Sequence, residues 1–248
     1  NVLDLRESVT PELSNDETTL LHLWINENDF RMGGSCLYQS YGLYGGETPD
    51  LEKPKQLKRL FNSTQKLLKQ HKICALHDIS DGGLITSLLE MSLCSGQGLS
   101  INLNLSDKSK IIPKLFSEEI GLVVEVPNKH LKGVKDYYQE KDIYCEEIAK
   151  KSVEKTFKLI NFNEEIFSVD INTLFKSWDS MSHQVQSERD SKTCASEEQD
   201  NFVNFDYFIT PEINFVTPKI SSSLFGKKPR VALLREQGIN GQYDMAAA

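Results

Sequence analysis

The sequence predicts an α/β or α+β sandwich, and two observations support this fold class. Short apolar stretches of strand character alternate with amphipathic helical stretches over the first 140 residues. Three further strand-like stretches then follow one another between residues 143 and 169. Strands that alternate with helices and end in a closing hairpin are typical of a layered sheet with covering helices. At 248 residues, the chain has room for one large domain, or one domain and a fragment.

The expected strands are short runs of apolar or alternating residues. Residues 19–25 read Thr-Leu-Leu-His-Leu-Trp-Ile and indicate a buried strand. Residues 121–126 indicate another, which Pro127 stops because proline cannot donate to a ladder. The remaining expected strands are residues 73–77, 99–105, 143–149, 156–161 and 165–169.

The expected helices are recognised by apolar residues at helical spacing. The helix that follows Gly83 is strongly apolar, and glycines at 96 and 98 end it. The helix at 174–186 carries Phe175 and Trp178, which we interpret as core anchors. The other expected helices are residues 35–41, 55–70, 111–116 and 128–139.

The composition changes after this last helix. Residues 187–200 are rich in Ser, Asp and Glu, and residues 217–230 contain two prolines and three serines. We interpret both as linker or extended packing segments. Residues 230–235 then indicate the first strand of a new domain, and a helix is expected from Gln242. The predicted division is therefore 1–173, a helix and linker segment at 174–228, and a truncated domain at 229–248.

Charge and cysteine content narrow the class of protein. A net charge of −8 argues against a nucleic-acid surface, which needs clustered Lys and Arg. No apolar run is long enough to span a bilayer, and no secretory segment is visible, so we expect a cytoplasmic protein. The five cysteines contain no Cys-x-x-Cys pair, which favours reduced, mostly buried thiols over a zinc or redox site.

The motif richest in chemistry is His77–Gly83 (His-Asp-Ile-Ser-Asp-Gly-Gly), placed between an expected strand and an expected helix. A helix N-terminus offers free N–H groups to a phosphate. Asp78 and Asp81 are hard oxygen donors of the kind that Mg²⁺ takes from proteins. Ser80 can donate to a phosphate. Binding of a Mg²⁺–nucleotide is one interpretation, and simple capping of the helix by Ser80 or Asp81 is the other.

Two further glycine-bearing turns are weaker candidates. Residues 33–35 (Gly-Gly-Ser) could line an anion site, but a tight turn with Ser35 as the N-cap explains them equally simply. Residues 235–241 follow an apolar stretch, where α/β folds commonly place ligands. Cys194 has no histidine nearby in the sequence, so a catalytic role for it is not expected.

Several of these segments together resemble a known family. Residues 75–98, with His-Asp-Ile-Ser-Asp-Gly-Gly-Leu, resemble the superfamily that contains aminoimidazole ribonucleotide synthetase. Residues 31–50 look like the preceding part of the large, single-chain phosphoribosylformylglycinamidine synthases. Residues 231–238 with 245–247 resemble the start of the glutaminase domain of that family, and the join between the two halves singles it out.

The resemblance implies an activity and a site. The family is a carbon–nitrogen ligase of purine biosynthesis that converts formylglycinamide ribonucleotide, with ATP and glutamine, to formylglycinamidine ribonucleotide. This segment would be the C-terminal part of the second synthetase-like half, followed by the start of a class I glutaminase. By position, Asp78 would be a Mg²⁺ ligand and Ser80 a contact of ATP or ADP. Ile79 departs from many members without disturbing either position.

The resemblance also implies what the segment lacks. Its partners would be the N-terminal synthetase half and the C-terminal glutaminase domain of the same chain, with no nucleic acid and no membrane. In the family, the nucleotide of the second half is structural, so we assign no catalytic residue here and expect the fragment alone to be inactive. The alternatives are a non-catalytic nucleotide-binding scaffold and a stand-alone enzyme of the synthetase superfamily.

Overall fold

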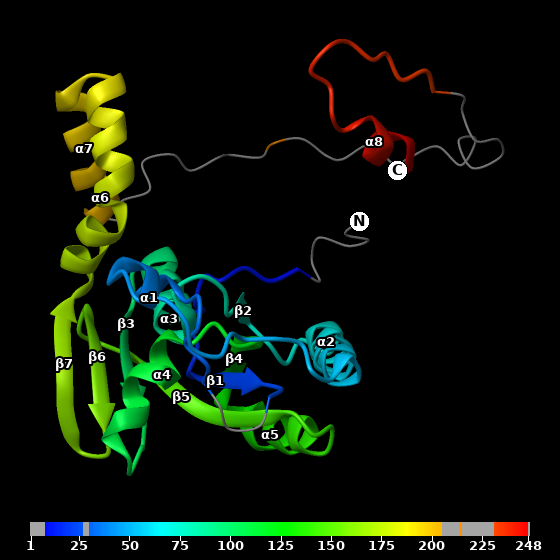
Figure 1. Ribbon diagram of the computed structural model, residues 1–248, viewed down its shortest axis with the longest axis vertical. Coiled ribbons are helices and arrows are strands. Elements are labelled where there is room, and N and C mark those ends of the chain that lie inside the picture. Colours follow the sequence, from blue (N-terminus) through cyan, green and yellow to red (C-terminus); the bar gives the residue numbers. More distant parts are fainter. Residues whose placement is uncertain (1–7, 27–29, 205–213, 215–230, 248) are drawn as a thin grey trace. The chain divides into compact units, whose positions relative to one another are not determined.

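The computed structural model describes residues 8–26, 30–204, 214 and 231–247. The chain divides into two compact units, one of residues 4–205 and one of residues 1–3 with 206–248. The first unit contains the sheet and the helices packed on it (Figure 1). Residues 217–230, expected as linker, lie outside the described residues.

The elements follow the predicted order closely. The closing strands and the short helix of residues 111–116 start and end within a few residues of their predicted bounds. The elements are β1 (Thr18–Trp24), α1 (Cys36–Ser40), α2 (Pro54–Lys69), β2 (Ala75–Asp78), α3 (Gly83–Ser95), β3 (Gly98–Asn102), η2 (Lys108–Lys110), α4 (Ile111–Phe116), β4 (Gly121–Pro127), η3 (Asn128–His130), α5 (Leu131–Gln139), β5 (Tyr144–Ser152), β6 (Thr156–Asn161), β7 (Glu164–Asp170), α6 (Ile171–Arg189), α7 (Lys192–Asn204) and α8 (Gln242–Ala247).

The seven strands form one mixed sheet in the order β2-β4-β1-β5-β3-β6-β7. The pairs β2–β4, β4–β1, β1–β5, β5–β3 and β6–β7 are antiparallel, and β3–β6 is parallel. The mixed α/β fold expected from the sequence is therefore confirmed. Strand β2, which leads into the His77–Gly83 motif, lies at one edge of this sheet.

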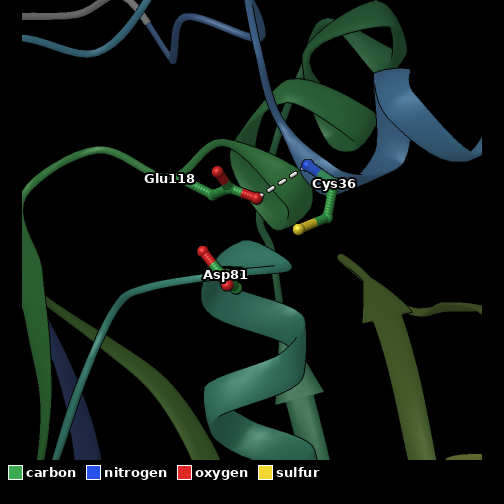
Figure 2. A group of neighbouring side chains, drawn as sticks. All are labelled: Cys36, Asp81 and Glu118. Carbon is green, nitrogen blue, oxygen red and sulfur yellow. Dashed lines mark hydrogen bonds between the residues drawn. The ribbon is translucent and has the colours of Figure 1, made fainter.

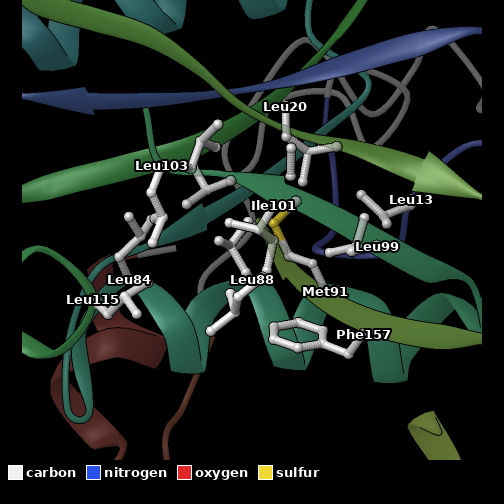
Figure 3. Close-up of a cluster of buried hydrophobic side chains, with 14 of the residues drawn as sticks. Leu13, Leu20, Leu84, Leu88, Met91, Leu99, Ile101, Leu103, Leu115 and Phe157 are labelled. Carbon is white, nitrogen blue, oxygen red and sulfur yellow. The ribbon is translucent and has the colours of Figure 1, made fainter. Parts of the chain in front are cut away.

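Helices cover both faces of the sheet, because successive strand residues point to opposite sides. Leu20 of β1 belongs to the core under α3 and α4, whereas Leu21 and Leu23 belong to the core under α2 and α5. In Figure 3, Leu84, Leu88 and Met91 of α3 point at the sheet. These three positions lie in the strongly apolar helix expected after Gly83, and each is at most 1% exposed.

Two predictions for the helical hairpin after the sheet are wrong. Residues 192–204, expected as linker in their first part, form α7, which packs along α6. Phe175 is buried as expected, but Trp178 is 53% exposed and is no core anchor. The sequence suggested a linker because the α7 stretch is polar. Polar contacts nevertheless join α7 to α6, such as the ion pair between Lys176 and Asp200.

The predicted strand of the second unit is also absent. Residues 231–236 have no regular secondary structure, and Val231 and Leu234 are exposed. A lone strand leaves its N–H and C=O groups unpaired, and the described part of the second unit contains no other strand to pair with it. Helix α8 is present where expected.

The cysteines are free, as predicted, but they are less buried than expected. Cys94 and Cys194 are exposed, and the other three are intermediate.

Candidate functional site

The turn between β2 and α3 presents polar side chains to solvent. Strand β2 pairs with β4 as far as Asp78, opposite Leu122, and the Ile79 amide donates to the Gly121 carbonyl at 3.0 Å. Beyond that point the chain leaves the sheet. Asp78, whose side chain is 70% exposed, Ser80 and Asp81 are all exposed there. The residues that the sequence singled out therefore lie together on one accessible turn.

Neither Ser80 nor Asp81 caps α3, so the capping interpretation is wrong. The N-cap is Gly82, with φ 84° and ψ −4°, and no side-chain hydrogen bond caps the helix there. Glycine adopts this left-handed conformation without the steric cost that other residues meet. The side chains of Ser80 and Asp81 are thus left for other roles.

Gly83 is required because the backbone of another segment lies against it. A Cβ atom built on Gly83 would lie 2.7–2.8 Å from backbone atoms of Leu115, Phe116 and Ser117. The residue also has φ 75°. The close approach that the glycines permit is therefore to the end of α4, within the protein.

A carboxylate that the sequence did not single out lies at the start of α3. Glu118 Oε1 accepts hydrogen bonds from the Gly82 amide at 2.9 Å and from the Cys36 amide at 2.8 Å (Figure 2). One carboxylate oxygen thus serves the first amides of α1 and α3, where negative charge is favoured. A phosphate seeking these amides would have to displace it. Only the tertiary fold reveals this role, since Glu118 follows α4 without any motif.

Glu118 belongs to a group of three side chains with the atoms to hold a cation. The Cys36 sulfur and a carboxylate oxygen each of Asp81 and Glu118 all lie within 4.8 Å of one another. Burial, and then the carboxylates of Glu118 and Asp81, raise the pKa of the Cys36 thiol. A protonated thiol is a poor ligand, and sulfur suits soft metals rather than Mg²⁺.

Two side chains contact the backbone carbonyl oxygen of Asp78. His77 Nδ1 lies 2.7 Å from this oxygen, and the Ser87 hydroxyl on α3 donates to it at 2.8 Å. The same ring nitrogen is 3.5 Å from Asp78 Oδ1. On its other side, His77 Nε2 lies 2.9 Å from Glu90 Oε2. These contacts fix the backbone of Asp78, while its carboxylate remains exposed.

The Gly33–Gly34–Ser35 segment is a tight turn with Ser35 as the N-cap of α1, which was one of its two interpretations. Ser35 caps α1 by accepting from the Tyr38 amide at 3.3 Å, and the Gly33 amide donates to the Glu47 carbonyl at 2.8 Å. A Cβ atom on Gly33 would lie 2.6 Å from the Glu47 and Gly46 carbonyl oxygens. The backbone of Gly33 therefore lies directly against the backbone of Gly46 and Glu47, with no room for a side chain.

Buried Glu119 joins the segment before this turn to the loop after α4. It accepts from Arg31 Nη2 at 3.0 Å and from Asn26 Nδ2 at 2.7 Å. The hydrogen bonds with Glu119 raise the pKa of Arg31. The guanidinium is therefore committed to Glu119, and to Glu52 at 2.7 Å, rather than left free for a ligand.

The third motif, residues 235–241, lies in the second unit. Gly238 has φ 92°, and the Ile239 amide donates to the Glu236 carbonyl at 3.3 Å. The motif is a turn before α8, as expected, but its side chains are solvent-exposed and form no described site.

Comparison with known families gives one match. The family described as AIR synthase related protein, C-terminal domain, matches residues 23–160, which is more than half of the chain. The chain belongs to this family. The matched region runs from β1 to β6 and contains the Asp78–Gly83 turn, so the candidate site lies within the AIR synthase related domain.

Solved structures with the same fold come from Thermotoga maritima. PurL complexed with FGAR is 15% identical with a TM-score of 0.57, over 68% of this chain and 30% of that one. PurL complexed with ATP is 13% identical with a TM-score of 0.55, over 67% and 27%. PurLQS is 12% identical with a TM-score of 0.54, over 98% and 34%. At these identities the likeness shows the fold alone. The chain spans about a third or less of each protein's length.

No helix among the described residues combines the length and apolar character needed to cross a membrane.

Proposed function

We propose that this chain is part of an ATP- and glutamine-dependent ligase that converts formylglycinamide ribonucleotide to formylglycinamidine ribonucleotide. Membership of the AIR synthase related family supports the proposal. Its fold is shared with PurL proteins whose structures were determined with ATP, ADP and FGAR. The other parts of the ligase would be an N-terminal synthetase half and a glutaminase domain of the same chain.

Within that ligase, the role we propose for this segment is to hold a Mg²⁺–nucleotide. The observation that carries it is the exposed Asp78 carboxylate on a backbone fixed by His77 and Ser87. A hard, accessible oxygen of this kind suits Mg²⁺, which takes one or two carboxylates and keeps its phosphate and water ligands. When bound, the ion would neutralise charge on the nucleotide phosphates.

Ser80 would contact the nucleotide through its side chain. It is exposed on the same turn, two residues after Asp78, and its hydroxyl can donate to a phosphate oxygen. The Gly82 amide is bonded to Glu118, so the contact would not depend on the free N–H of a helix start. We propose that this nucleotide is structural, as the resemblance implies for the second synthetase-like half, and that turnover takes place elsewhere in the ligase.

The proposal is tested by replacing Asp78 in the full-length protein. Asp78→Asn and Asp78→Ala should each reduce the nucleotide that stays bound through purification by about tenfold or more, as expected for loss of a metal ligand. Glutamine- and ATP-dependent turnover should change less than the bound nucleotide. Bound nucleotide is measured by chromatography after denaturation.

Asp136→Asn, on the exposed surface of α5, is the matched control and should change neither quantity. Unchanged nucleotide in both Asp78 variants would remove the assignment. If the 248-residue chain alone formed the amidine product, the reading as a stand-alone synthetase would be correct instead.

A further inference from the structure

A chain of polar contacts connects Asp78 to helix α6. Glu90 lies in the third turn of α3 and contacts His77 Nε2 through Oε2 at 2.9 Å. Its other oxygen, Oε1, accepts from Trp178 Nε1 of α6 at 3.4 Å. The contacts run in the order Trp178, Glu90, His77 and Asp78. They bring α6, α3 and β2 together at the Glu90 carboxylate.

The contacts of His77 define its orientation. Its Nδ1 faces the Asp78 carbonyl and its Nε2 faces the Glu90 carboxylate. Both partners present oxygen atoms, and the two contacts together fix the orientation of the ring. Without Glu90, one nitrogen would lose its partner and the ring could turn away from Asp78. The side chain of His77 is only 15% exposed, so water would replace that partner poorly.

We infer that Glu90 and His77 are positioning residues for the Mg²⁺–nucleotide, acting on Asp78, and that Trp178 completes the contact from α6. The inference rests on the proposed function of Asp78. A residue behind a metal ligand sets its direction, and its loss typically costs 10–100-fold in metal affinity. The arrangement fits this role because the contacts converge on Asp78, whose side chain is 70% exposed.

A purely structural role explains the arrangement less well. Glu90 is 30% exposed and Trp178 is 53% exposed, and polar contacts at such positions contribute little to folding stability. The core beneath them is made by apolar residues of α3, such as Leu88 and Met91. A stability defect should therefore be small when Glu90 is replaced, whereas Mg²⁺ affinity should change.

The test uses the full-length protein stripped of nucleotide, and measures retained ADP against Mg²⁺ concentration. Glu90→Ala and His77→Ala should raise the Mg²⁺ midpoint about tenfold. Glu90→Gln keeps an oxygen acceptor and should raise it less. Trp178→Phe keeps the ring and should raise it about twofold, as expected for a single long hydrogen bond. Binding of ADP in excess chelator should stay unchanged in all four variants, and the thermal midpoint should change little.

Glu140→Gln, at the exposed end of α5, is the control. If Asp78→Asn raises the Mg²⁺ midpoint while Glu90→Ala and His77→Ala match the control, the positioning role is overturned and the proposed function stands. If Asp78→Asn itself has no effect, the proposed function fails and this inference fails with it. An equal loss of ADP binding with and without Mg²⁺ would indicate a general defect and would also overturn the positioning role.

Discussion

At the scale of single residues, buried charge is concentrated next to the central strand. His22 of β1 is 2% exposed, stacks on Trp24 with ring centroids 4.7 Å apart, and lies 3.3 Å from Glu146. Glu146 also pairs with Lys114 of α4, whose side chain is 4% exposed. Burial lowers the pKa of His22, and this effect outweighs the opposing attraction of Glu146. The ring is therefore held neutral inside the fold.

This lowered pKa predicts a loss of stability on mild acidification. Below the ordinary value of 6.5, the unfolded chain takes up a proton at His22 that the folded chain does not. The free energy of unfolding should fall as pH drops from about 6.5 toward the folded pKa, by at most about 1.4 kcal/mol per pH unit for one proton. His22→Gln should flatten this slope in urea unfolding at a series of pH values.

The pKa of Glu146 is also lowered, because the bond with His22 and the Lys114 ammonium outweigh the effect of burial. Its contribution to stability is present above pH 4.5 and is lost as the pH falls through the lowered pKa. An equal slope in the His22→Gln protein would contradict the prediction.

The site residues differ in whether the local sequence alone is enough to identify them. Asp78 and Ser80 could be predicted because a strand, a polar glycine-bearing turn and a helix follow one another. Glu118 and Glu90 could not, because their partners are set by packing between α3, α4 and α1 and by the end of β2. Trp178 was misjudged for a related reason. Its apolar ring suggested a core position, but its N–H reaches Glu90 at the surface.

At the scale of elements, the junction of α3 with α4 depends on Gly83. Gly83→Ala places a methyl group into the backbone of residues 115–117 and imposes a left-handed conformation. We expect a loss of about 3 kcal/mol or more in the free energy of unfolding. Chemical denaturation of the purified variant measures it.

Gly133→Ala on α5 should have the opposite effect on the stability of the protein. No heavy atom lies within 4 Å of its hypothetical Cβ, and the residue is in a helix interior. Alanine there should stabilise the protein by about 0.5–1 kcal/mol. Equal effects at both glycines would show that backbone clash does not control the α3–α4 junction.

Elements with an apolar face were predicted well, and polar ones were not. Helices α2 and α3 start and end within about two residues of their predicted bounds. Helix α7 was missed because it carries few apolar residues to reveal its period. Ala195 is buried against α6, while polar pairs such as Gln199 with Asp179 join the two helices. A helix of this kind is defined by its neighbour, which local periodicity does not reveal.

At the scale of the whole molecule, the two hydrophobic cores are confined to the first unit. Among the described residues, both clusters lie between Leu13 and Ile171, with partly buried neighbours as far as Leu174. A chain ending at residue 205 should therefore keep its thermal midpoint within about 2 °C of the 248-residue chain, equivalent to less than about 1 kcal/mol. Differential scanning calorimetry of the two chains compares them directly.

A chain ending at residue 170 is the informative comparison. It removes Ile171 and Phe175, which are buried, and should unfold at a clearly lower temperature. If the chain ending at residue 205 lost as much stability as this one, residues beyond 205 would contribute to the fold of the first unit.

The central place of β1 has a consequence for synthesis. Strand β1 is made before its partners β4 and β5, which begin about 100 and about 120 residues after it ends. At roughly 5–20 residues per second, the ribosome leaves Leu20, Leu21 and Leu23 without a sheet for about 5–20 s. Pairing of this range is also intrinsically slow. The newborn chain thus passes through an interval in which this apolar strand is open to chaperones, or to the same strand of another chain.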